Sequence, residues 1–163
     1  MDAEKFTKKS LEVIESCEKL AYEYNNQELT QAHLMYALVT VEDSLVAKLL
    51  TNMGINMEAF KGECEKLVAN RPKVSGGQLF TSPEFSKALI QAEKEAKQMG
   101  DDYISVEHIF LGLLEKADKD IKRVINAYGI TRGKFLEVLA NIRGNRKVES
   151  DNPEDTYDAL NKY

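Results

Sequence analysis

The sequence has little of what marks several classes of protein. It has no tryptophan, only 3 prolines and 9 glycines among its 163 residues, and no apolar run near the roughly 20 residues that a membrane-spanning helix needs. So few turn residues favour helices over the closely spaced turns of an all-β fold. With 43% hydrophobic and 30% charged residues, the composition is that of a globular protein. We therefore expect a compact α-helical chain without a membrane partner.

Cysteine, basic charge and an export signal are also scarce. Cys17 and Cys64 have the spacing of neither a disulfide framework nor a metal site, and both fall at apolar positions of helical patterns, where free thiols are commonly buried. The first ten residues, MDAEKFTKKS, lack the apolar segment of an export signal. A net charge of −5 argues against a nucleic-acid partner, which requires a basic surface. These features predict a cytoplasmic protein.

The common catalytic motifs are missing as well. The sequence contains no G-x-x-x-x-G-K-[ST], H-E-x-x-H, C-x-x-C or G-x-S-x-G pattern. Its two histidines, His33 and His108, each occupy the third position of a predicted helix, where hydrogen bonding at the helix start is the expected role. We predict a non-catalytic chain with no metal and no cofactor of its own.

What the sequence does contain is an internal duplication. At an offset of 75 residues (His33 to His108), residues 14–68 align without a gap to residues 89–143. Identical pairs occur at Glu18/Glu93, Lys19/Lys94, Ala21/Ala96, His33/His108, Leu38/Leu113, Asp43/Asp118, Gly54/Gly129, Ile55/Ile130 and Phe60/Phe135. The alignment predicts two copies of one structural unit.

Matching start and stop signals predict four helices in each unit. Polar residues that accept backbone N–H groups at helix starts recur in both copies, at Thr30, Ser105, Asp43, Asp118, Asn56 and Thr131. Gly54 and Gly129 are expected to end the third helices in a left-handed conformation. Ser82-Pro83 is a typical start for the first helix of the second copy, and Gly100 is its expected end.

These elements predict an all-α fold, a tandem duplication of a four-helix unit with pseudo-two-fold symmetry. The first repeat is expected over 1–70, a linker over 71–81 and the second repeat over 82–144. Residues 145–163 are polar and rich in turn formers, so we expect an exposed, flexible linker with a short final helix after Asn152-Pro153.

A group of acids marks the start of the second helix of the second copy. Asp101, Asp102 and Glu107 lie there beside Tyr103. One interpretation is an ordinary solvated surface. The other is a site for cationic or polar groups of a peptide, next to a groove at the seam between the two units. Such a site would bind a chain without breaking its bonds.

The repeated pattern resembles a known family. Two copies of [TS]-x-x-H-[LI], each followed by A/G-L and a glycine-isoleucine stop, are similar to the double repeat at the amino terminus of the Clp ATPases, over about residues 3–143. The phrases RPKVSGG and NPEDTYDALNKY resemble the ClpB disaggregases, whereas SVEHIFLGLL also resembles ClpC. These phrases leave both the ClpB and the ClpC subfamilies open.

The resemblance implies the substrate- and adaptor-binding domain of a ClpB-like AAA+ chaperone. It implies unfolded or aggregated protein clients, adaptor proteins, and a hexameric parent whose ATP is bound by ATPase modules outside this chain; the isolated fragment is expected to be a monomer. The polar positions of client handling correspond to Thr7, Asp101 and Glu107, and Tyr103 lies beside them. The alternative is a ClpC-like domain that docks adaptors for a protease. Relatives of that kind carry a glutamate before the histidine in both copies, where this chain has Ala32 and Glu107.

Overall fold

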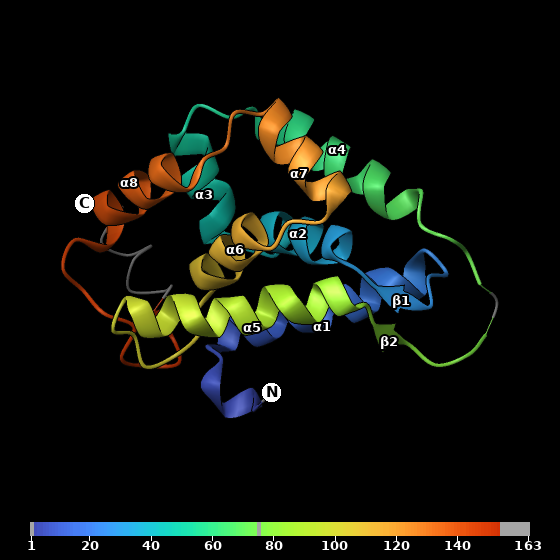
Figure 1. The fold of residues 1–163 in the computed structure, drawn as a ribbon, viewed down its shortest axis with the longest axis horizontal. Helices are drawn as coiled ribbons and strands as arrows, with labels where there is room; N and C mark the ends of the chain where they lie inside the picture. Colours follow the sequence, from blue (N-terminus) through green and yellow to red (C-terminus); the bar gives the residue numbers. More distant parts are fainter. Residues whose placement is uncertain (1, 75, 154–163) are drawn as a thin grey trace.

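The computed structural model describes residues 2–74 and 76–153 and is almost entirely helical (Figure 1). A short 3-10 helix, Ala3–Lys5, precedes α1. The remaining elements are α1 (Lys8–Glu23), β1 (Glu28–Leu29), α2 (Gln31–Thr40), α3 (Leu45–Asn52), α4 (Met57–Ala69), β2 (Phe80–Thr81), α5 (Pro83–Gln98), α6 (Val106–Glu115), α7 (Lys119–Ala127) and α8 (Arg132–Arg143).

The helix boundaries follow the predicted signals at all but one position. Helices begin directly after Thr30, Asn56, Ser82, Ser105, Asp118 and Thr131. Gly54, Gly100 and Gly129 have φ values of 85°, 71° and 65°, the left-handed conformation expected of residues that follow a helix.

The start of α3 differs from the prediction. Asp43 was expected to cap this helix, but Ser44 does so, and Asp43 adopts a left-handed conformation with φ 54°. The Ser44 hydroxyl accepts the backbone N–H of Ala47 and donates to the carbonyl of Leu38. An ionised carboxylate could not donate to that carbonyl, so serine suits this corner better than aspartate.

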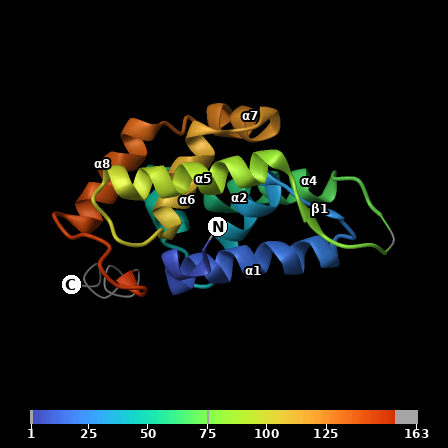
Figure 2. The same ribbon diagram turned by 60° about the horizontal axis from the view of Figure 1, so that its bottom comes forward.

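One hydrophobic core runs through both repeats. Helices α2 and α6 lie at its centre and are buried over most of their length. In the view of Figure 1, α1 and α5 lie below this central pair and α4 and α7 lie above it, whereas the turned view of Figure 2 separates α1 from α5. Helix α6 crosses α5 closely at Gly112, where a Cβ atom would collide with the backbone of Ala88 and Ala92.

Each repeat contributes its leading segment to the other repeat. The N–H of Thr7 donates to the carbonyl of Ile104 at 3.0 Å, and the N–H of Ser82 donates to the carbonyl of Leu29 at 2.9 Å. Both pairs are equivalent at the 75-residue offset. The second exchange forms the parallel pair β1–β2, in which Glu28 lies opposite Phe80. This pair of two-residue strands and an isolated parallel bridge between Phe6 and Ile104 are additions to the predicted all-helical fold.

Most described residues of the segment after α8 are exposed, as predicted, but the segment is packed at Val148. Val148 is fully buried, and its backbone pairs with the loop at Asp101 and Asp102. The prediction overlooked a single apolar residue within a polar stretch. Residues 154–163, with the predicted final helix, lie outside the described residues. Within residues 2–74 and 76–153, no helix is long and apolar enough to cross a membrane, and no group of three or more His, Cys, Asp or Glu side chains could hold a metal ion.

Candidate functional site

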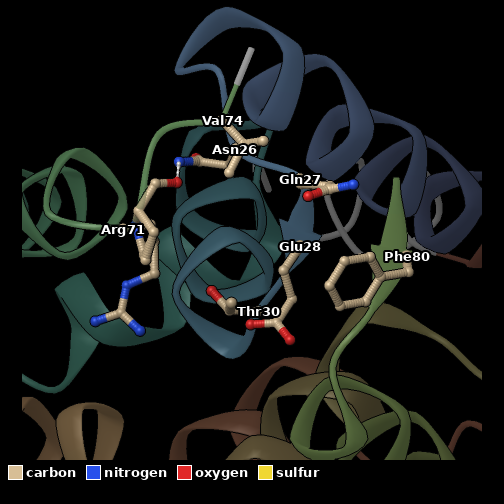
Figure 3. A pocket seen from close by; sticks show the side chains of 8 residues that line it. Asn26, Gln27, Glu28, Thr30, Arg71, Val74 and Phe80 are labelled. Carbon is tan, nitrogen blue, oxygen red and sulfur yellow. Dashed lines mark hydrogen bonds between the residues drawn. The ribbon is translucent and has the colours of Figure 1, made fainter. Parts of the chain in front are cut away.

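A hollow of about 180 Å³ opens beside the two-stranded pair (Figure 3). It is lined by Asn26, Gln27, Glu28, Thr30, Arg71, Pro72, Val74 and Phe80. Two of its apolar side chains are open to solvent, Phe80 at 51% exposed and Val74 at 43%. Apolar groups held open to solvent beside a strand can contact the side chains of an extended peptide.

Polar contacts fix the walls of this hollow. The guanidinium of Arg71 lies 2.7 Å from the Asp120 carboxylate, and its Nε donates to the carbonyl of Leu67 at 3.2 Å. The Asn26 side chain donates to the carbonyl of Pro72 at 3.2 Å, the bond drawn in Figure 3. The linker that carries the exposed apolar residues is therefore held against the first repeat.

Behind the hollow, His33 acts as a neutral hydrogen-bonding group. The N–H of Thr30 donates to His33 Nδ1 at 3.0 Å, so the ring proton lies on Nε2, which donates to Asn26 Oδ1 at 2.9 Å. Burial lowers the pKa of His33 to about 4, and the positive charge of Arg71 adds to the effect. His33 thus has the structural role predicted for it.

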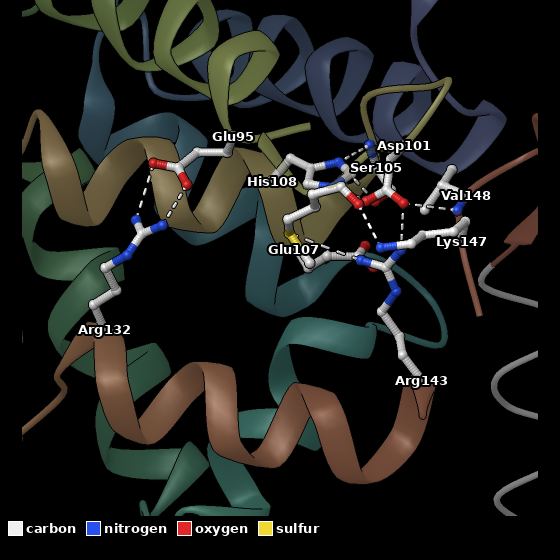
Figure 4. A network of polar contacts seen from close by, with 10 residues as sticks. Glu95, Asp101, Ser105, Glu107, His108, Arg132, Arg143, Lys147 and Val148 are labelled. Atoms are coloured by element: carbon white, nitrogen blue, oxygen red, sulfur yellow. Dashed lines mark hydrogen bonds and ion pairs between the residues drawn. The ribbon is translucent and has the colours of Figure 1, made fainter. Parts of the chain in front are cut away.

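The second repeat carries a charged version of the same arrangement (Figure 4). The N–H of Ser105 donates to His108 Nδ1 at 2.9 Å, and His108 Nε2 donates to Asp101 Oδ2 at 2.7 Å. Asp101 Oδ1 accepts from Arg143 at 2.5 Å and from the N–H of Val148 at 2.9 Å. Burial alone would raise the pKa of Asp101, but the hydrogen bonds from His108 and Arg143 outweigh it and hold that pKa below its ordinary value.

The structure brings the predicted site residues together but buries most of them. Thr7 caps α1 and pairs with the Ile104 backbone, directly beside the loop that carries Asp101 and Tyr103. Thr7, Asp101 and Glu107 are buried, and Tyr103 is half-buried. The solvated-surface interpretation is therefore wrong for Asp101 and Glu107, whereas Asp102 is exposed as that interpretation expects. Neither buried carboxylate is open to a client in this structure, and their part in client binding stays a prediction.

The residues around the hollow were missed by sequence reasoning. Phe80 was assigned to the linker, and Arg71 and Val74 were given no role. The available signal was Phe80 itself, a lone aromatic residue at the end of a polar, glycine-containing stretch. Such a side chain has few apolar neighbours in the sequence with which to form a core, so exposure could have been expected.

Comparison with known proteins identifies the family. Residues 5–128 match the model of the Clp repeat (R) N-terminal domain. The chain belongs to this family. A Chaperone protein ClpB from Nitratidesulfovibrio vulgaris is 42% identical over all of the chain, and one from Clostridium tetani is 39% identical over all of it. The chain spans 20% and 19% of these relatives, about a fifth of their length.

Solved structures show the same fold. The Hsp104 N-terminal domain from Candida albicans superimposes with a TM-score of 0.79 at 21% identity, over 90% of this chain and 97% of that one. A complex of the ClpV N-domain with a VipB peptide has a TM-score of 0.69 at 18% identity, over 87% of this chain and 89% of that one. Similarity at this level of identity establishes a Clp N-domain fold for this chain.

Proposed function

We propose that this chain is the N-terminal client- and adaptor-binding domain of a ClpB-like AAA+ chaperone that disaggregates and unfolds proteins. ATP hydrolysis would take place in modules of a cytoplasmic, hexameric parent, and this domain would bind chains without catalysis. Relatives named ClpB, 42% and 39% identical over the whole chain, support this role over the ClpC-like alternative.

The observation that carries the proposal is the hollow beside β1 and β2, with its two exposed apolar side chains. We propose that Phe80 and Val74 contact apolar side chains of an extended client segment, while Glu28 and Arg71 contact its polar groups. A peptide complex is known for the ClpV N-domain, whose fold this chain shares.

Binding should be weak. The site offers one exposed aromatic anchor, and a disordered client must lose conformational freedom when it binds. Six tethered copies in a hexamer would raise the effective concentration of such sites. Tyr103 is a second candidate contact for the client. Thr7, Asp101 and Glu107 are buried beneath the surface around Tyr103 and would influence binding by fixing its shape.

The test is an NMR titration of the labelled chain with a reduced, carboxymethylated protein that stays unfolded. Amide shifts should concentrate on residues 26–30, 71–74 and 80. A Phe80→Ala variant should weaken binding about tenfold, the usual loss for a central aromatic contact. Ile90→Ala is the matched control, because Ile90 is 50% exposed on α5 and does not line the hollow.

Three outcomes would count against the proposal. Equal losses in Phe80→Ala and Ile90→Ala would indicate non-specific apolar binding. Shifts confined to the surface around Tyr103 would move the site to the second repeat. ATP hydrolysis by the purified chain would contradict the non-catalytic assignment.

A further inference from the structure

The segment that follows α8 crosses from one repeat to the other. We define residues 145–151 as the strap. Lys147 Nζ donates to the carbonyl of Met99 at 2.7 Å, and the N–H of Asp102 donates to the carbonyl of Val148 at 2.8 Å. The carbonyl of Asp151 accepts the N–H of Lys8, in the first turn of α1, at 2.8 Å. The strap therefore joins a loop of the second repeat to the first helix of the first repeat.

Asp101 is the side chain that connects the strap to the interior. One of its oxygens accepts from the strap backbone at Val148 and from Arg143, and the other accepts from His108. Two buried side chains, His108 of α6 and Arg143 of α8, set the orientation of this carboxylate. In Figure 4 it lies between the imidazole and the guanidinium, with Val148 beyond it.

The first repeat provides an internal comparison. Asn26 occupies the place of Asp101, and Val68 that of Arg143. Asn26 accepts from His33 and donates to the carbonyl of Pro72. An amide fits that position because the linker presents an acceptor there. In the second repeat the strap presents an N–H group, which requires an acceptor, and a carboxylate supplies it.

In the buried network of the second repeat, two carboxylates lie near one guanidinium. Arg143 faces two carboxylates, Asp101 at 2.5 Å and Glu107 at 3.8 Å. Both Glu107 oxygens are buried without a hydrogen-bond partner among the described residues. Burying a carboxylate in this way costs free energy. Of the two carboxylates, Asp101 is the one that accepts a hydrogen bond from the strap, and Glu107 makes none to it.

We propose that Asp101, His108 and Arg143 are positioning residues that hold the strap closed on α1 through the ion pair between Asp101 and Arg143. The strap opens when Asp101 loses its charge or its partners, and the domain core stays folded. This inference concerns the strap alone and does not depend on client binding at the hollow.

Amide hydrogen exchange of the whole chain tests this inference. In the wild type, the amide of Val148 should exchange far more slowly than in an unstructured peptide. Asp101→Asn should speed exchange across residues 146–151 by about tenfold or more, since hydrogen bonds to a charged group are lost. Amides of α2 and α4 should change much less.

Glu107→Gln is the matched control. It makes the same chemical change in the same network, but Glu107 does not bond to the strap. Strap exchange in this variant should stay within about twofold of the wild type. If Asp101→Asn fails to fold, Val148→Pro serves instead, because it removes the N–H that donates to Asp101 and leaves the three side chains intact. Val148→Ala is its control, since it loses the buried side chain but keeps the N–H, and strap exchange should rise more in Val148→Pro.

The inference is overturned if the wild-type strap exchanges as fast as an unstructured peptide. It is also overturned if Asp101→Asn, or Val148→Pro in its place, leaves strap exchange unchanged, or if Glu107→Gln opens the strap to the same extent. The last result would indicate that the network stabilises the second repeat in general.

Discussion

Gly112 offers the sharpest test of how the two central layers pack. A Cβ atom at this position would overlap the carbonyl oxygen of Ala88 and lie 3.0 Å from the backbone N of Ala92. Both obstacles are main-chain atoms of α5, so no side chain can rotate away. Gly112→Ala must therefore push α5 and α6 apart or distort one of them.

The magnitude follows from two opposing effects. Overpacking a tight core costs about 1–3 kcal/mol. Replacing glycine by alanine within a helix returns about 1 kcal/mol. Since rigid backbone blocks the methyl group, the steric cost should be in the upper part of its range, and we expect a net loss of about 1–2 kcal/mol.

Urea denaturation followed by circular dichroism measures this loss. With a slope of roughly 1–3 kcal/mol per molar urea, the midpoint should fall by about 0.3–2 M. Gly62→Ala in α4 is the control. Its Cβ would meet nothing within 4 Å, so the same substitution should stabilise the protein by up to about 1 kcal/mol.

The two variants should thus shift the midpoint in opposite directions. A Gly112→Ala protein as stable as the wild type would refute the close helix crossing, and with it the arrangement of α5 over α6.

Three further predictions concern buried groups. The pKa of His33 is about 4 in the folded chain and about 6.5 in the unfolded chain, so the unfolded chain binds more protons between these pH values. The free energy of unfolding should therefore fall by about 1.4 kcal/mol for each pH unit as the pH drops through this window. His33→Gln should flatten this slope, which denaturant titrations at several pH values would measure. Cys17 and Cys64 should not react with DTNB until guanidinium unfolds the chain, because burial raises both thiol pKa values, that of Cys64 to about 12. Arg132 bonds both oxygens of the buried Glu95, at 2.6 and 2.9 Å, so Arg132→Met should cost about 1–3 kcal/mol in thermal or urea unfolding; a wild-type midpoint would show that solvent replaces this pair.

The fold was predictable because local chemistry and the repeat agree. Thr30 and Ser105 lie at the same place in two copies, as do Gly54 and Gly129, so each helix boundary was supported twice. The error at Asp43 arose because two capping residues are adjacent in the sequence. The choice between them depends on the Leu38 carbonyl, a contact that no sequence pattern reveals.

The candidate site was predicted less well. The sequence located Asp101 and Glu107 correctly, at the loop before α6 and in its first turn. Their burial depends on Arg143, which is some 40 residues later in the sequence and lies at the end of α8. A charge on a helical pattern is normally assigned to the surface, and its buried partner becomes apparent only in three dimensions. Exposure of Phe80 likewise depends on the path of the linker past β1.

The exchanged leading segments bear on how such a domain could begin. A single repeat would leave its own first segment and its own loop carbonyl without these partners. Two identical units meeting about a two-fold axis would satisfy both, through the bonds now made by Thr7 with Ile104 and by Ser82 with Leu29. Joining such units in one polypeptide makes the association independent of concentration and leaves each copy free to specialise: one has an amide at Asn26, and the other has a carboxylate at Asp101.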